Sequence, residues 1–273
     1  FLPVENIELL SRYGSDQTTV ELDRLGGGGW QTRKAKLKNR IREIAGELIK
    51  IAAARHLHEA PKLPVQPGLY DEFCARFPYD ETEDQLGAIE STLKDLELGR
   101  PMDRLICGDV GFGKTEVALR AAFAVALEGK QVAVVVPTTL LARQHARTFT
   151  ERFKGFPVNV AQASRLVATK ELNLVKKGIA DGSVDIVVGT HALLGKAIKF
   201  RDLGLVIVDE EQHFGVTHKE RLKALRSEVH VLTLSATPIP RTLQLALTGV
   251  RELSLIATPP VDRMAVRTFI SPF

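Results

Sequence analysis

Cysteine is scarce in this sequence of 273 residues, which contains only Cys74 and Cys107. Two cysteines exclude a disulfide framework and a four-cysteine zinc site, and they favour a reducing, cytoplasmic setting. No apolar run approaches the roughly 18 residues of a membrane-spanning helix, so we expect no membrane association. The first residues contain neither an initiator Met nor a basic signal segment. We therefore expect a piece of a longer protein that is not secreted.

Charge is unevenly distributed although the formal net charge is only +4. Residues 31–58 contain eight Lys and Arg against two Glu, whereas residues 59–100 contain four against ten acidic residues. A basic segment either contacts nucleic acid or forms a solvated helix surface. We prefer the solvated surface for 31–58, which is strongly amphipathic. Residues 101–273 carry 23 basic and 16 acidic residues, and this surplus is the better candidate for contact with nucleic acid.

Glycine and proline divide the chain. Four glycines at 26–29 predict a flexible break, and the apolar residues that follow recur at helical spacing in a basic amphipathic helix to about Arg55. Pro61, Pro64, Pro67 and Gly68 predict a linker. The expected organisation, in chain order, is 1–25 as the end of a preceding module, 26–60 as break and helix, 61–76 as linker, 77–257 as the main domain, and 258–273 as a tail.

From Phe77 onward, short apolar runs alternate with helical stretches. The runs are apolar on both faces, as buried parallel strands must be, so we predict an α/β domain with a doubly wound parallel sheet. The predicted strands are Arg104–Cys107, Gln131–Val136, Val158–Ala161, Asp185–Val188, Leu205–Val208 and Val231–Leu234. The predicted helices are Glu83–Leu96, Lys114–Glu128, Thr139–Phe153, Thr169–Ala180, His218–Leu225 and Arg241–Leu247.

A phosphate-binding loop follows the first predicted strand. Residues 108–115 match G-x-x-x-x-G-K-[ST] between a strand and a helix, which is the context that supports the motif. Backbone N–H groups and the helix N-terminus would hold the phosphates of ATP, and Lys114 would bridge the β- and γ-phosphates. The predicted nucleotide contacts here are Gly108, Asp109, Val110, Gly111, Phe112, Gly113, Lys114, Thr115 and Glu116.

Two acidic residues, Asp209 and Glu210, follow the apolar run Leu205–Val208. Alone they would indicate only a polar strand end. Together with the phosphate-binding loop they predict a catalytic pair, in which Asp209 and Thr115 hold Mg²⁺ and Glu210 polarises the attacking water. The predicted catalytic residues are therefore Lys114, Asp209 and Glu210, and the predicted cofactors are ATP and Mg²⁺.

The ordered motifs resemble those of superfamily 2 helicases and translocases. They comprise Pro137–Gln144, Asp209–His213 and Ser235–Thr242, in addition to the phosphate-binding loop. The resemblance implies a RecA-like lobe that contacts the backbone of a nucleic acid. It also implies that Phe77 and Gln85, with Thr82 between them, recognise adenine.

The same resemblance assigns two further sets of residues. Contacts with the DNA backbone are expected from Thr138, Thr139, Arg143, Gly189, Thr190 and His191, and from Arg165 because it should lie at the same edge of the sheet. Coupling of nucleotide state to the DNA site is expected from Gln212, His213, Ser235, Thr237 and Arg241. Position 213 departs from the pattern, because relatives commonly have Arg there.

At a finer level, residues 108–118, 237–243 and 256–260 resemble the bacterial transcription-repair coupling factor family, and so do Ser11-Arg12-Tyr13 and the Gly26–Trp30 segment. That family implies a translocase on double-stranded DNA that displaces stalled RNA polymerase. It also implies the excision-repair protein UvrA as a further partner and 1–25 as the end of a polymerase-binding module. A second motor lobe would lie beyond this chain, so we expect the chain to bind ATP or ADP and to hydrolyse it poorly. The alternatives are a RecG-like branch-migration motor, or a nucleotide-binding interaction module without catalysis of its own.

Overall fold

The computed structural model describes residues 28–195, 197–236 and 251–261. By its internal contacts the chain forms two compact units, Phe1–Leu48 and Ile49–Phe273, and the sheet belongs to the second. In the described part of the chain, no helix is both long enough and apolar enough to cross a membrane. The predicted helix Arg241–Leu247 and the segment 1–25 lie outside the described residues.

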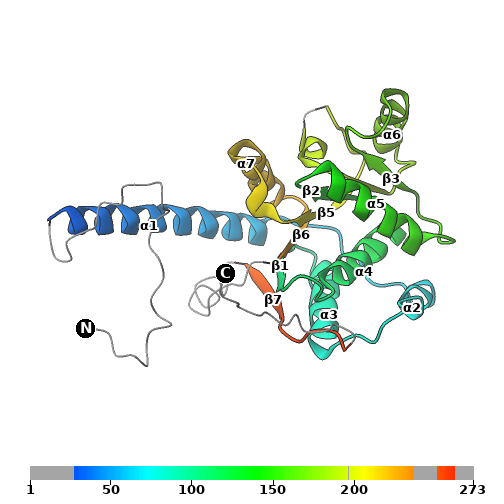
Figure 1. Ribbon diagram of the computed structural model, residues 1–273, viewed down its shortest axis with the longest axis horizontal. Coiled ribbons are helices and arrows are strands. Elements are labelled where there is room, and N and C mark those ends of the chain that lie inside the picture. The colour runs from blue at the N-terminus through cyan, green and yellow to red at the C-terminus, as the bar shows by residue number, and fades with distance from the viewer. Residues whose placement is uncertain (1–27, 196, 237–250, 262–273) are drawn as a thin grey trace, which may run out of the picture. The chain divides into compact units, whose positions relative to one another are not determined.

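From β1 onward, helices and parallel strands alternate along the second unit, whereas α1 crosses the division between the two units (Figure 1). The helices are α1 (Gly28–Leu57), α2 (Leu69–Ala75), α3 (Glu83–Glu97), α4 (Lys114–Leu127), α5 (Thr139–Phe153), α6 (Thr169–Asp181) and α7 (Val216–Leu225), with short 3₁₀ turns η2 (His191–Leu194) and η3 (Glu211–His213). The strands are β1 (Asp103–Gly108), β2 (Gln131–Val136), β3 (Val160–Ala163), β4 (Ile186–Thr190), β5 (Leu203–Asp209), β6 (His230–Ser235) and β7 (Glu252–Ile256).

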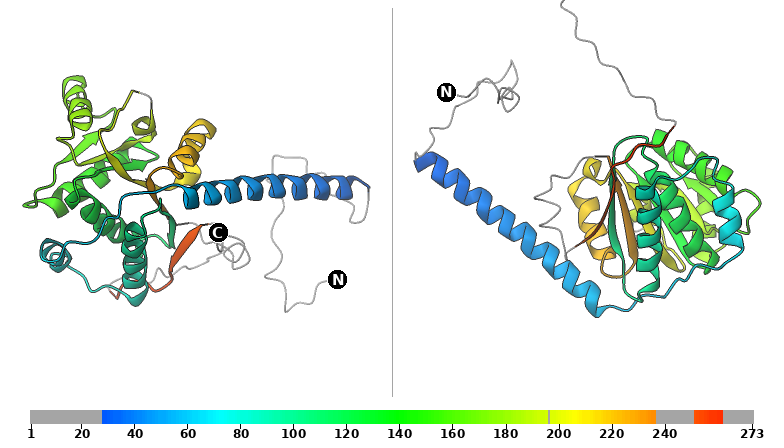
Figure 2. Two further views of the ribbon diagram at one scale, coloured as in Figure 1. Left: turned by 180° about the vertical axis from the view of Figure 1, so that it is seen from behind. Right: turned by 90° about the horizontal axis from the view of Figure 1, so that it is seen from below.

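The seven strands form one parallel sheet in the order β3-β4-β2-β5-β6-β1-β7. Successive side chains face opposite layers, because the side-chain period of a strand is two. In β2, Val132 and Val134 join the core beneath α2, α3, α4 and α5, whereas Ala133 and Val135 join the core with α6, η2 and α7. Figure 2 shows these layers from two further directions. The α/β doubly wound, RecA-like fold expected from the sequence is confirmed.

Parallel strands place all their carboxyl ends at one edge of the sheet. Val136 at the end of β2 pairs with Thr190 at the end of β4, and Cys107 near the end of β1 pairs with Ser235. Ligands of open α/β sheets bind at this carboxyl edge. The phosphate-binding loop and the other predicted site segments therefore converge on it.

Some predicted elements need correction. Helix α1 begins at Gly28, inside the predicted glycine break. The predicted linker 61–76 contains α2, whose Phe73 is fully buried and stacks on Phe123 at 4.2 Å between ring centroids. Apolar packing of Phe73 thus holds in place a segment that its prolines predicted to be an irregular linker.

Strand β3 begins two residues later than expected, at Val160, where pairing with Ile186 of β4 begins. The apolar residues Phe156 and Val158 are buried, but they lie in a turn in which Val158 N donates to Phe156 O at 2.8 Å. Strand β7 was not predicted at all. It alternates polar and apolar residues and pairs with β1 at the sheet edge. The prediction missed it because it relied on strands that are apolar on both faces.

Partly buried ion pairs connect the amino end of β1, the start of β7 and the residues after β5. Asp103 accepts from Arg251 Nε at 2.9 Å, and Arg226 donates to Glu211 at 2.7 Å. Arg55 near the end of α1 is 3% exposed and pairs with Glu252 of β7 at 2.8 Å. The Arg251–Asp103 and Arg55–Glu252 pairs support the position of β7 beside β1, because Arg251 directly precedes β7 and Glu252 begins it.

His230 makes the fold sensitive to acid. It is 1% exposed, its Nδ1 accepts from Met102 N at 3.1 Å, and burial lowers its pKa from 6.5 to about 4. The unfolded chain therefore binds this proton more readily, so stability is full above the unfolded pKa and falls as the pH drops from 6.5 towards 4. We expect a loss of about 2 kcal/mol between about pH 7.5 and pH 5.

The test is urea unfolding of the wild type and of His230→Asn at both pH values. Asn keeps an acceptor near the position of Nδ1 but does not titrate, so the variant should lose much less stability on acidification. An equal pH dependence in the two proteins would show that other groups carry it.

Candidate nucleotide-binding and catalytic site

The phosphate-binding loop connects β1 to α4 and depends on glycine backbone geometry. Gly111 and Gly113 have φ values of 81° and 80°, in the left-handed region that side chains disfavour. A Cβ on Gly113 would lie 2.3 Å from Gln85 Nε2. The loop therefore requires glycine at Gly113 for two independent reasons.

Lys114 begins α4 and folds back over the loop. Its Nζ donates to Gly108 O at 2.8 Å and to Asp109 O at 2.9 Å. Burial lowers the pKa of Lys114, while the negative charges of Asp209 and Glu210 oppose that shift. The predicted catalytic residues thus lie within electrostatic reach of one another. The cation is held over the loop at the N-terminus of α4, where an anion is favoured.

Gln85 supports the loop from α3. Its Oε1 accepts from Thr82 N at 3.0 Å, and its Nε2 donates to Phe112 O at 3.0 Å. The side chain is buried, and Thr82 caps α3 by accepting from Gln85 N. Both ends of the amide thus make contacts within the protein. Recognition of adenine by Gln85 stays a prediction, to which the structure adds a direct contact with the loop.

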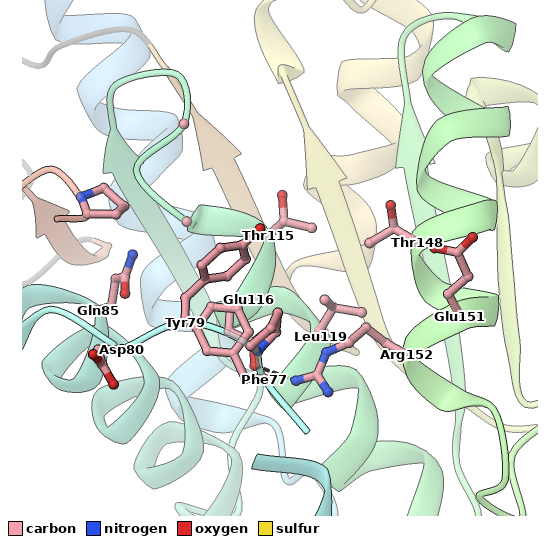
Figure 3. Close-up of a pocket in the computed structure, with 14 residues that line it drawn as sticks. Phe77, Tyr79, Asp80, Gln85, Thr115, Glu116, Leu119, Thr148, Glu151 and Arg152 are labelled. Carbon is pink, nitrogen blue, oxygen red and sulfur yellow. Dashed lines mark hydrogen bonds and ion pairs between the residues drawn. The ribbon is translucent and has the colours of Figure 1, made fainter. Parts of the chain in front are cut away.

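A cavity of about 610 Å³ opens beside the phosphate-binding loop (Figure 3). Phe77 and Tyr79 line it with rings 5.5 Å apart in an edge-to-face arrangement. Gly113 and Thr115 line it from the loop side. Aromatic walls beside phosphate-binding groups suit a nucleotide base. Tyr79 was not predicted as a site residue. Its position two residues after Phe77, which was predicted, could have suggested that both aromatic rings line the same cavity.

Glu116 lines this cavity and also has a structural role. Its Oε1 accepts from Arg120 Nε at 3.0 Å and from Arg152 Nη2 at 2.7 Å, and Arg120 also pairs with Glu81. Arg152 comes from α5 and stacks over Phe73 at 4.2 Å. Its side chain lines the cavity (Figure 3). No sequence motif marked Arg152, because only the packing of α5 against α4 brings it there.

Glu210 follows β5 in a strained conformation. Its φ is 52°, and among the described residues it is the one non-glycine with positive φ. Its Oε1 accepts from Ala236 N at 3.2 Å, and its Oε2 accepts from Gln212 Nε2. Strain of about 1–3 kcal/mol persists only where the surroundings enforce it, and it is typical of functional sites. Here the end of β6 enforces it, since Glu210 N also donates to Leu234 O at 3.1 Å.

Asp209 ends β5 and contacts a residue that the sequence did not suggest. Its Oδ2 lies 3.0 Å from Nε2 of His145 on α5. Both side chains are mostly buried, at 16% and 11% exposed. His145 carries no motif signal of its own, and only the fold brings it to Asp209.

The predicted DNA contacts lie along the carboxyl edge with different exposures. Thr138 caps α5 by accepting from Leu141 N at 3.2 Å, and Arg143 and Arg165 are exposed. Thr190 is only 8% exposed, and a Cβ on Gly189 would lie 2.3 Å from the carbonyl oxygen of Ala163. The packing of β4 therefore requires glycine at position 189, independently of any contact with DNA.

His191 lies at the same edge, in η2. Its ring centroid is 4.2 Å from that of His218 on α7. Burial lowers the pKa of His191, and the nearby His218 and Arg165 add to the shift. The ring is therefore largely neutral at neutral pH, and Arg143 and Arg165 are the charged members of the set.

The predicted coupling residues are only partly described. Gln212 contacts Glu210, and Ser235 ends β6 directly before Ala236. Thr237 and Arg241 lie outside the described residues, as does the side chain of His213. The hydrogen bond from Ala236 N to Glu210 nevertheless joins two of the predicted motifs.

Comparison with known proteins gives consistent results. The chain is 56% identical to the transcription-repair-coupling factor of Rickettsia prowazekii (strain Madrid E) over 277 residues, covering 100% of this chain and 25% of that protein. It is 50% identical to the factor of Bacillus subtilis (strain 168), covering 99% and 23%. The chain thus spans about a quarter of the length of these curated relatives. The resemblance predicted from the motifs is confirmed.

Solved structures support the same fold. RecG bound to a three-way DNA junction aligns with a TM-score of 0.70 and 33% identity, over 87% of this chain and 32% of RecG. A hypothetical ATP-dependent RNA helicase from Sulfolobus tokodaii aligns with a TM-score of 0.51 and 21% identity, covering 70% and 57%, and shares the fold.

A family model for DEAD/DEAH box helicases matches residues 82–246. The match extends from the cap of α3 past the end of β6, so it covers more than half of the chain and includes Lys114, Asp209 and Glu210. The chain therefore belongs to the DEAD/DEAH box helicase family.

Proposed function

We propose that this chain is the ATP-binding lobe of a double-stranded DNA translocase. The observation that carries the proposal is the convergence of Lys114, Asp209 and Glu210 at one sheet edge, with Glu210 bonded to the segment after β6. Nucleotide binding would change the charge beside that bond, because the charges of Glu210 and Lys114 already interact. The lobe would thus transmit nucleotide state through the end of β6.

Mg²⁺ suits the donors at this site. The Thr115 hydroxyl and the Asp209 carboxylate are hard oxygen ligands, which Mg²⁺ prefers. They would hold the ion, which neutralises charge on the β- and γ-phosphates when bound. Lys114 would bind the phosphates, and Glu210 would orient the attacking water and take up its proton.

The partners follow from similarity to the coupling factors. By their name these relatives couple transcription to repair. We propose that the full-length protein displaces stalled RNA polymerase in the cytoplasm and recruits UvrA. The chain alone should bind ATP or ADP and hydrolyse ATP slowly, because a second lobe would complete the cleft. Steady-state ATP hydrolysis with and without duplex DNA tests this, and a fully DNA-stimulated rate from this chain alone would contradict it.

RecG-like fork remodelling is the second candidate, because RecG aligns over 87% of the chain. The two functions differ in their substrate rather than in their motor. Release of a stalled polymerase and regression of a model fork, measured side by side with the full-length protein, would separate them. Fork regression without polymerase release would favour the second candidate.

We expect charge reversal at Arg143 and Arg165 to weaken binding of duplex DNA. Both side chains are exposed at the carboxyl edge, where contacts with phosphates would be independent of sequence. Each lost phosphate contact reduces the slope of log affinity against log salt by about 0.9. Arg143→Glu with Arg165→Glu should therefore lower the affinity at least tenfold at low salt and flatten its salt dependence.

A matched control is Lys94→Glu with Lys154→Glu. It changes the net charge equally, at exposed sites at the ends of α3 and α5, away from the carboxyl edge. If both double variants weaken DNA binding equally, the attraction comes from overall charge, and this edge is not the DNA track.

A further inference from the structure

His145 is the residue whose contact with the catalytic site no motif explains. It lies on α5, and its Nε2 is 3.0 Å from Asp209 Oδ2 at the end of β5. The side chains are 11% and 16% exposed, so water competes little for this contact. An ionised carboxylate can only accept, and therefore Nε2–H of His145 is the donor.

The contact fixes the orientation of the Asp209 carboxylate. Rotation of an aspartate about χ2 has broad energy wells, so its backbone alone does not determine where the two oxygens point. A hydrogen bond to Oδ2 removes this freedom and leaves the remaining lone pairs for a cation. Partners of this kind, which hold a metal ligand without touching the metal, typically change metal affinity 10- to 100-fold when removed.

The position of His145 along α5 adds a second consequence. Arg143 lies two residues earlier on the same helix, and Thr138 caps that helix at the carboxyl edge. A displacement of α5 would therefore move the imidazole relative to Asp209. The orientation of the carboxylate thus depends on where α5 lies.

We propose that His145 is a positioning residue for Asp209, which sets the affinity of the site for Mg²⁺ through the placement of α5. This proposal rests on the proposed function, since it assumes that Asp209 holds the ion that accompanies the nucleotide. It adds a residue and a structural link that neither the phosphate-binding loop nor the acidic pair contains.

The test uses this chain and a fluorescent ADP analogue, with Mg²⁺ titrated at fixed nucleotide and with EDTA as the metal-free reference. We expect His145→Leu to raise the Mg²⁺ concentration for half-maximal enhancement of binding about tenfold or more, and to leave metal-free affinity unchanged. His145→Gln should retain most of the wild-type Mg²⁺ response, because the glutamine Nε2 lies the same number of bonds from Cα as the histidine Nε2 and can donate to Asp209.

The matched control is Gln144→Leu, the same loss of a polar group at the exposed neighbouring position. A His145→Leu protein with the wild-type Mg²⁺ response would overturn the proposal. An equal loss of nucleotide affinity in Mg²⁺ and in EDTA would also overturn it, because such a loss indicates a packing role. Failure of His145→Gln to restore the wild-type Mg²⁺ response would overturn it for the same reason. If the wild type binds no nucleotide, the proposed function itself fails, and this proposal fails with it.

Discussion

Glu210→Gln should abolish DNA-stimulated ATP hydrolysis, measured in a protein of the full length of the curated relatives, while nucleotide still binds. Gln keeps the shape of the side chain and can still accept from Ala236 N, but it cannot take up a proton from water. General-base catalysis typically contributes about 10²–10⁴-fold, so kcat should fall by that amount. ADP affinity should change by less than about threefold, because Lys114 and the loop remain intact.

The control is the same change at the next residue, Glu211→Gln. The Glu211 carboxylate faces Arg226 at 2.7 Å, in the ion-pair cluster rather than in the nucleotide site. This variant should lose thermal stability and retain its turnover. If Glu210→Gln kept a substantial share of wild-type turnover, the catalytic role of Glu210 would be wrong.

Lys114→Ala should reduce affinity for Mg-ADP by about 10- to 150-fold, measured calorimetrically with this chain. A charge-assisted contact to phosphate in a partly buried site is worth about 1.5–3 kcal/mol, and alanine removes it entirely. The ammonium bonds Gly108 O and Asp109 O over the loop, and its third N–H can donate to phosphate without loss of either contact. The measured loss should therefore come mainly from phosphate binding.

Lys114→Met separates charge from volume, since it keeps most of the aliphatic stem. It should bind as weakly as the alanine variant if the ammonium is responsible. Lys154→Ala, at an exposed position after α5, should bind like the wild type. Unchanged affinity in Lys114→Ala would exclude the phosphate-binding role.

The parts of the fold that were predicted correctly are those that the sequence encodes locally. Strands such as Gln131–Val136 are apolar on both faces, and that run matches β2 in full. The phosphate-binding loop was predictable for the same reason, because its glycines and Lys114 are neighbours in sequence. Asp209 and Glu210 required one further step, namely that parallel strands share their carboxyl edge.

The parts that were missed depend on contacts between distant segments. Arg152 reaches Glu116 only through the packing of α5, and His145 reaches Asp209 in the same way. The polar alternation of β7 is that of an edge strand, and it becomes meaningful only once β1 is known to lie beside it. Propensity and periodicity carry no information about such partners.

The strand order also determines when the protein can build its site during synthesis. Strand β1 lies between β6 and β7, so both of its neighbours come from the last third of the chain. Asp103 can pair only after Val231 has been synthesised, and Gly108 can pair with β7 only after Ile256 has been synthesised. Contacts between such distant residues form slowly, and chains fold as they leave the ribosome. The phosphate-binding loop is therefore made early but positioned last, so a nascent chain shorter than about the end of β7 has the complete motif without the complete pocket.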